Sequence, residues 1–412
     1  MILKRDFIIL SLILSKITKI LIKARYNYAF AREKGFLKHG SKLQSLNHKD
    51  SIFSNHFILR IFMLKKLSFW GISSGLVLGI FAPILVYLGN PGNMGVCAAC
   101  FLRDTSGALG MQGAVQYARP EVLGIVIGAL IVSLASGKFS SRGGASPIAR
   151  FFLGVFGMFG ALVFLGCPWR ALLRLGAGDL SAIAGIVGLI AGILIGLYFV
   201  FKRGFSLGES KEQASIIGFI FPAFVLFILV MLFIGEDGVL KFSTKGPGSM
   251  HAAIAISLIA GLALGAVFAK SGFCTIGVVK TLIIDKNTAL LQATIALLIS
   301  TVIVNVILGQ FNLGFSGQPI AHNDVLWNFL GMVLAGLCFT LGGGCPGRQL
   351  VRCGQGDNDS AVFVMGLIAG GALAHNFAIA ASPKGIGANS ASAVIIGIIF
   401  CLVLAFFAKA KA

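Results

Sequence analysis

Two segments of the chain, 178 residues apart, carry nearly the same arrangement of cysteine, proline and arginine. They read Gly166-Cys-Pro-Trp-Arg-Ala-Leu-Leu-Arg-Leu-Gly-Ala-Gly-Asp179 and Gly344-Cys-Pro-Gly-Arg-Gln-Leu-Val-Arg-Cys-Gly-Gln-Gly-Asp357, with nine of fourteen positions identical. Each copy follows a long apolar segment. A thiol with an arginine three residues later places a weak hydrogen-bond donor near a fixed positive charge. The duplication indicates one small-molecule path that is built twice.

Both copies should interrupt a helix at the cysteine. Proline lacks a backbone N–H and disfavours the α conformation of the residue before it, so the chain leaves the helix at Cys167 and Cys345. In lipid, such a break is tolerated only inside protein or beside a water-filled cavity. The alternative is a helix end that glycine and proline merely terminate. Arg170 and Arg348, repeated in both copies, favour a functional site.

Two further cysteines follow predicted membrane spans at corresponding places, Cys100 after the first span and Cys274 after the sixth. Thiols, backbone N–H groups and cations together suit a soft, polarizable anion that is bound weakly and released. The same cations can favour a thiolate and so permit transient sulfur chemistry. The predicted substrate path comprises Cys100, Cys167, Cys274, Cys345, Arg103, Arg170, Arg348 and Lys270.

The remaining cysteines allow other interpretations. Cys97-Ala-Ala-Cys100 could be a redox pair, half of a metal site or a coincidence. No second such pair or nearby histidine completes a zinc site, so no metal is predicted. A membrane thiol-disulfide oxidoreductase or sulfur-relay protein is therefore the alternative function. Cys338 and Cys401 lie within apolar runs and are predicted to be small apolar core residues.

Composition excludes an ordinary soluble domain. Hydrophobic residues make up 57% of the chain, charged residues only 12%, and there are 54 glycines. The net charge is +20, but 22 of the 34 Lys and Arg lie from Met63 onward, mostly in short loops, which is a topology signal rather than a sign of nucleic-acid binding. The sequence has no Walker A motif. We predict no cofactor and no enzymatic activity.

The fold predicted is an all-α integral membrane protein of about ten spans in two five-segment repeats, residues 63–240 and 241–412, with interrupted helices. Ser74–Gly79 resembles Ala260–Gly265, and two further short echoes follow in the same order. The predicted spans are 67–90, 122–137, 148–165, 180–201, 215–235, 250–270, 288–308, 325–343, 360–382 and 391–408.

Five spans in each half force the second half to be inverted relative to the first. The loop charges agree, since 15 Lys and Arg fall on one side of the membrane and 7 on the other. The positive-inside rule then places both ends of the core in the cytoplasm. Residues 1–62 form a basic extension, either translated from an upstream start or serving as a targeting segment.

The chain resembles the YeeE/YedE membrane protein family, most closely its branch linked to selenium metabolism. The resemblance runs from about Met63 to the carboxyl terminus. It is carried by Cys97-Ala-Ala-Cys-Phe-Leu-Arg-Asp104, Gly166-Cys-Pro-Trp-Arg170, Ser271-Gly-Phe-Cys-Thr275 and Gly343-Gly-Cys-Pro-Gly-Arg-Gln-Leu350.

The family includes bacterial thiosulfate uptake proteins. The resemblance implies import of an inorganic sulfur or selenium species across the inner membrane, with Cys167, Cys274 and Cys345 contacting it through S–H hydrogen bonds. It also implies a soluble sulfur-carrier partner of the TusA/SirA type. The predicted function is therefore a transporter, with the oxidoreductase and a scaffold for sulfur carriers as alternatives.

Overall fold

The computed structural model describes residues 67–235 and 238–408, so the predicted extension 1–62 lies outside the described residues. A helix occupies each of the ten predicted spans. In chain order the long helices are α3 (Phe69–Tyr87), α5 (Pro120–Ala135), α6 (Pro147–Val163), α8 (Ala182–Lys202), α9 (Ser215–Gly218) with α10 (Ile220–Ile234), α11 (Ile254–Ser271), α13 (Ala289–Ile307), α14 (Val325–Leu341), α16 (Asn358–Asn376) and α17 (Ser390–Phe407). The protein is an all-α, multi-pass membrane protein.

Eight helical stretches of the described residues are long and apolar enough to cross a membrane. Three of these stretches are 30 residues long, because each joins a long helix to the short helix that follows it. The four short helices are α4 (Ala98–Ala108), α7 (Pro168–Gly176), α12 (Thr275–Ile283) and α15 (Pro346–Gly354). Both halves therefore contain long and short helices in the same order, and the short helices are the elements that carry the cysteine motifs.

Glycine allows the long helices to pack closely in pairs. The most extensive pairings are α3 with α13, α5 with α11, α6 with α16 and α8 with α14. A Cβ atom at Gly75 would lie 1.9 Å from the carbonyl oxygen of Ala293, and one at Gly192 would lie 2.2 Å from that of Val333. Backbones can approach this closely only without a side chain, as is typical of helix packing in lipid. Each pairing joins a helix of one half to a helix of the other.

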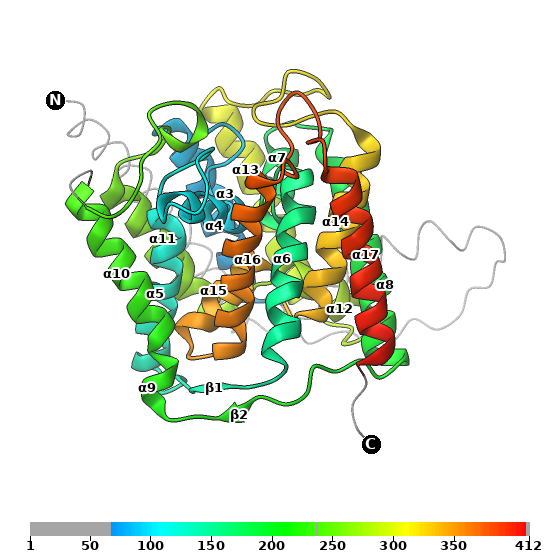
Figure 1. Ribbon diagram of the computed structural model, residues 1–412. Coiled ribbons are helices and arrows are strands. Elements are labelled where there is room, and N and C mark those ends of the chain that lie inside the picture. Colours follow the sequence, from blue (N-terminus) through cyan, green and yellow to red (C-terminus); the bar gives the residue numbers. More distant parts are fainter. Residues whose placement is uncertain (1–66, 236–237, 409–412) are drawn as a thin grey trace, which may run out of the picture. The chain divides into compact units, whose positions relative to one another are not determined.

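The two copies of the Cys-Pro motif end at opposite ends of the membrane core. Two short antiparallel strands, β1 (Arg142–Gly143) and β2 (Lys211–Glu212), lie at one end, and Asp357 bridges to β1 there (Figure 1). Asp179 instead bridges to Gly314. That loop, between α13 and α14, lies at the other end (Figure 1).

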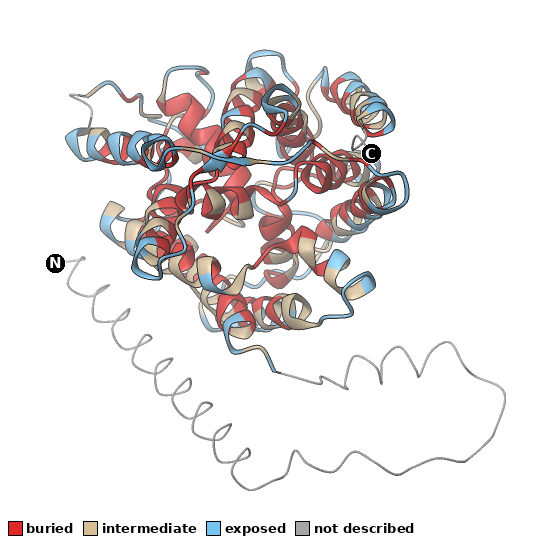
Figure 2. Cartoon of the chain, turned by 90° about the horizontal axis from the view of Figure 1, so that it is seen from below, coloured by how far each residue is buried: buried red, intermediate tan, exposed pale blue. Residues whose placement is uncertain are grey.

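The outer surface is apolar, and the interior combines a hydrophobic core with buried polar and charged side chains. Figure 2 shows buried residues concentrated among the central helices and exposed residues on the outward faces. The exposed side chains of the outer helices include large apolar groups such as Ile307 and Phe233, as expected of a surface that faces lipid. Arg119, Arg170 and Arg174, in contrast, are completely buried. The interior can therefore hold charge.

Candidate functional site

Each of the four short helices begins at a buried cysteine. The N-cap residues of α4, α7, α12 and α15 are Cys97, Cys167, Cys274 and Cys345. All eight cysteines of the chain lie in the described residues and are free and buried. The first backbone N–H groups of a helix lack intrahelical partners and carry partial positive charge. Four thiols thus lie at four positive helix ends.

Three cysteines of the first half form one group, which we call the first thiol cluster: Cys97, Cys100 and Cys167. The Cys97 side chain lies close enough to that of Cys167 to interact with it. Its sulfur also accepts a hydrogen bond from the backbone N–H of Cys100, at 3.3 Å. The Cys97-x-x-Cys100 spacing therefore closes the first turn of α4, and the Cys-Pro motif of α7 brings the third thiol.

Arg170 holds a positive charge against the first thiol cluster. Its Nη1 donates to Cys100 Sγ at 3.4 Å. Its Nε and Nη2 donate to the carbonyl oxygens of Asn93 and Ile320, at 2.8 and 2.9 Å. Among the described residues it forms no ion pair with a carboxylate. A guanidinium whose charge no carboxylate neutralises raises the local affinity for an anion.

Cys274 and Cys345 form the second thiol cluster, at the N-termini of α12 and α15. Their side chains lie close enough to interact with each other, and both interact electrostatically with Arg348. Nη1 of Arg348 is buried without a hydrogen-bond partner among the described residues. The second cluster, like the first, combines cysteines at helix N-termini with an arginine. Within the described part of the chain, Arg348 has a guanidinium nitrogen without a hydrogen-bond partner, whereas all three guanidinium nitrogens of Arg170 donate to an acceptor.

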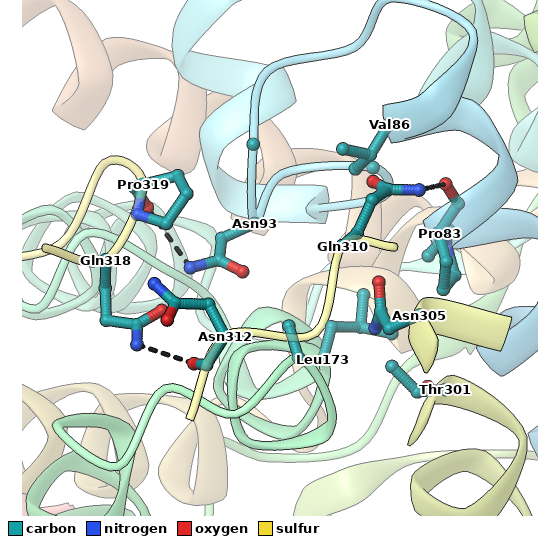
Figure 3. A pocket seen from close by; sticks show the side chains of 14 residues that line it. Pro83, Val86, Asn93, Leu173, Thr301, Asn305, Gln310, Asn312, Gln318 and Pro319 are labelled. Carbon is teal, nitrogen blue, oxygen red and sulfur yellow. Dashed lines mark hydrogen bonds between the residues drawn. The ribbon is translucent and has the colours of Figure 1, made fainter. Parts of the chain in front are cut away.

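A pocket with a mixed polar and apolar lining lies beside the first cluster (Figure 3). Its volume is about 270 Å³, and none of its fourteen lining residues is charged. Five carboxamide side chains line it: Asn93, Asn305, Gln310, Asn312 and Gln318. The backbone oxygen of Asn93 accepts from Arg170, so the guanidinium adjoins the pocket wall. Sequence analysis missed this pocket because its residues are scattered over two loops and three helices.

Comparison with protein families agrees with this geometry. Residues 270–409 match the family model described as sulphur transport. This part of the chain is therefore similar to the sulphur transport family, in agreement with the predicted YeeE/YedE family. The matched range contains the whole second thiol cluster with Arg348, and the first cluster repeats the same parts outside it. No curated protein matches the chain. The match supports the predicted family, and its description points to a role in sulphur transport.

Two cations of the predicted path have surroundings that differ from the prediction. Arg103, one turn after Cys100, pairs with Asp104 at 2.5 Å, and Asp104 in turn accepts from Arg119 at 2.8 Å. Lys270 is exposed at the end of α11, with its ammonium 4.8 Å from the centre of the Trp70 ring. The structure therefore brings Arg103 near the first cluster but pairs it with a carboxylate that it shares with Arg119, and it places Lys270 on the surface.

The correspondence between the cysteines of the two halves also differs from the prediction. Cys100 was expected to correspond to Cys274, but the N-cap position equivalent to that of Cys274 belongs to Cys97. Both N-caps have extended backbone, with φ of −142° and −157°. Cys338 and Cys401 lie 3.2 Å apart at their sulfur atoms, fully buried between α14 and α17. Their predicted role as core residues fits this packing.

The described residues offer little for a metal. No group of three histidine, cysteine or acidic side chains among them is placed to hold an ion. Thiols, helix N-termini and guanidinium groups instead form a set of donors, and such a set is suited to an anion.

Proposed function

We propose that the protein passes a small sulfur- or selenium-containing anion across the inner membrane along a path formed by the two thiol clusters. The match to the sulphur transport family supports transport as the activity. The observation that carries the cysteine path is the position of the four thiols, each at the start of a short helix and close enough to interact with the thiol at the start of another.

The chemistry of these groups fits weak, reversible binding. S–H groups are weak donors, and helix N-termini contribute partial positive charge without a counter-ion. Arg170 and Arg348 add a full positive charge to the first and second cluster, respectively. A large, polarizable anion such as thiosulfate or a selenium oxyanion can exchange its hydration for such contacts and still leave, because no single contact is strong.

An inverted arrangement of the two halves would present one cluster to each side of the membrane. The common order of helices and the opposite positions of Asp179 and Asp357 support it (Figure 1). The loop charges favour a cytoplasmic position for the end that carries β1 and β2 and for both ends of the membrane core. A sulfur-carrier protein of the TusA/SirA type would meet the anion, or its sulfur, at that end.

Labelling of introduced cysteines should reveal the opposite orientation. Ser316 is exposed near Gly314 and the first motif, and Ser140 is exposed with its N–H bonded to Gln355 of the α15–α16 connection. All native cysteines are buried, so an impermeant maleimide should report the new one. In intact spheroplasts we expect Ser316→Cys to react and Ser140→Cys to react only after permeabilisation. Equal labelling of both would rule out the inversion.

Uptake by liposomes containing the purified full-length protein tests the function. We expect entry of labelled thiosulfate, selenite or sulfite without any redox partner. Arg348→Met should lose most of this uptake because it removes the free donor beside the second cluster. Lys384→Met, which removes an exposed loop charge, should keep it.

The rival function predicts a different outcome. The three neighbouring thiols of the first cluster could pass a disulfide to a soluble carrier. An oxidoreductase would show no uptake of any of the three anions but would exchange thiols with that carrier. That result would replace transport by sulfur relay as the activity of this chain.

A further inference from the structure

One aromatic side chain lies between the two thiol clusters. Trp169 is the second residue after Cys167 of the first cluster. Its ring packs onto Gly347, the second residue after Cys345, and a Cβ atom added at Gly347 would lie 2.0 Å from Cη2 and Cζ2 of the indole. The Cys-Pro segments of the two halves therefore meet through this ring.

Two phenylalanines complete a layer of rings at this level. Phe268 lies 5.0 Å and Phe273 lies 6.4 Å from Trp169, measured between ring centres, and the two phenylalanines are 5.4 Å apart. All three side chains are almost completely buried. Phe273 directly precedes Cys274 of the second cluster. The layer of rings therefore adjoins residues of both clusters.

The indole also carries an unused polar group. Its Nε1–H is buried and has no hydrogen-bond partner among the described residues. The indole nitrogen can only donate, and an unsatisfied buried donor is costly enough to be rare in native structures. A donor kept in that state at the junction of two anion-binding clusters has an evident acceptor, which is the anion itself.

The two motif copies differ most in side-chain size at the position of Trp169 and Gly347. The two motif copies agree at nine of fourteen positions, yet the residue after Cys-Pro is tryptophan in one and glycine in the other. These two residues are the ones in contact. One large ring and one missing side chain thus fill a single space between the halves.

We propose that Trp169 is the constriction of the path and that its indole N–H is a binding site for the anion between the two thiol clusters, with Gly347 providing the space that the ring occupies. The ring blocks open flow, and the N–H replaces part of the water that the anion loses. This inference rests on the proposed function and adds to it the residue that limits passage.

Fluorescence tests the binding site independently of transport. The chain has three tryptophans, so Trp70→Phe with Trp327→Phe leaves Trp169 as the sole emitter. We expect thiosulfate or selenite to shift or quench its emission in a saturable manner. No response to either anion would overturn the binding site. A response in a protein that takes up neither anion would leave the site standing and would contradict the transport function instead.

Uptake by variants tests the constriction. Trp169→Phe keeps an aromatic ring but removes the donor, and we expect uptake to fall on the order of tenfold. Gly347→Ala should stop uptake because its Cβ collides with the ring, and Trp169→Ala in the same chain should restore it. Wild-type uptake in Trp169→Phe, or no restoration in a folded double variant, would overturn the constriction.

A matched control separates this effect from general damage to packing. A Cβ atom at Gly157 would also meet an aromatic ring, that of Phe339, at 2.6 Å, but between α6 and α14. At equal amounts of monodisperse protein, Gly157→Ala should retain uptake. A loss equal to that of Gly347→Ala would assign both losses to packing and overturn the proposal.

Discussion

Replacement of Arg174 by methionine is expected to lower the free energy of unfolding by about 3–5 kcal/mol, because it leaves a buried carboxylate without its partner. Arg174 and Asp179 are both fully buried and pair at 2.6 Å. The same guanidinium donates to the carbonyl oxygen of Phe164 and the hydroxyl of Ser181, both at 2.8 Å. Thermal unfolding in detergent, followed by the loss of monodisperse protein, measures the effect.

The second motif copy provides the control. Arg352 pairs with Asp357 at 2.5 Å but is partly exposed, and Arg142 remains 3.4 Å from the same carboxylate. In the Arg352→Met variant, Asp357 still has Arg142 as a cation and lies at a site with some access to water. The unfolding midpoint of this variant should therefore stay much closer to that of the wild type. Equal destabilisation by Arg174→Met and Arg352→Met would show that the contribution of the Arg174–Asp179 pair to stability does not come from its burial.

Substitution of Cys345 should distinguish hydrogen bonding from covalent chemistry. If the thiol only donates, Cys345→Ser keeps a donor and should retain part of the uptake. Cys345→Ala removes it, so the dehydrated anion loses a partner at a cost on the order of 1–3 kcal/mol, roughly five- to hundredfold in rate. If sulfur or selenium is exchanged covalently, both variants should fail alike, because a hydroxyl is not an adequate nucleophile.

Initial uptake rates at matched membrane abundance decide between these outcomes. Cys401→Ala is the control, because this thiol lies against Cys338 between α14 and α17 and outside both clusters. It should change uptake little. Wild-type rates in both Cys345 variants would remove this cysteine from the mechanism.

The long helices could be predicted because a bilayer imposes their length and apolarity on the sequence. The sixth predicted span, 250–270, appears as α11, Ile254–Ser271. The duplicated motif identified Cys167, Cys345 and their arginines for a similar reason, since proline and glycine dictate where a helix is interrupted.

Other parts of the site depend on contacts that leave no local signal. Whether Cys97 or Cys100 caps α4 is decided by backbone conformation, and both residues suit a helix start. Lys270 precedes Cys274 by four residues, but α11 ends between them at Gly272, with φ of 68°, and the chain turns away. The contact between Trp169 and Gly347 joins residues 178 positions apart, and only the packing of the two halves reveals it.

The contact between Trp169 and Gly347 also bears on whether half of this chain could work as a symmetric homodimer. Two identical halves would place the same residue on both sides of the symmetry axis. Two indoles could not fit where a single Cβ already comes within 2.0 Å of the ring, and two glycines would leave no ring to close the path. Joining the halves in one polypeptide allows the two positions to differ. A separately expressed first half should therefore not assemble into a closed pore with itself, whereas it should with the second half.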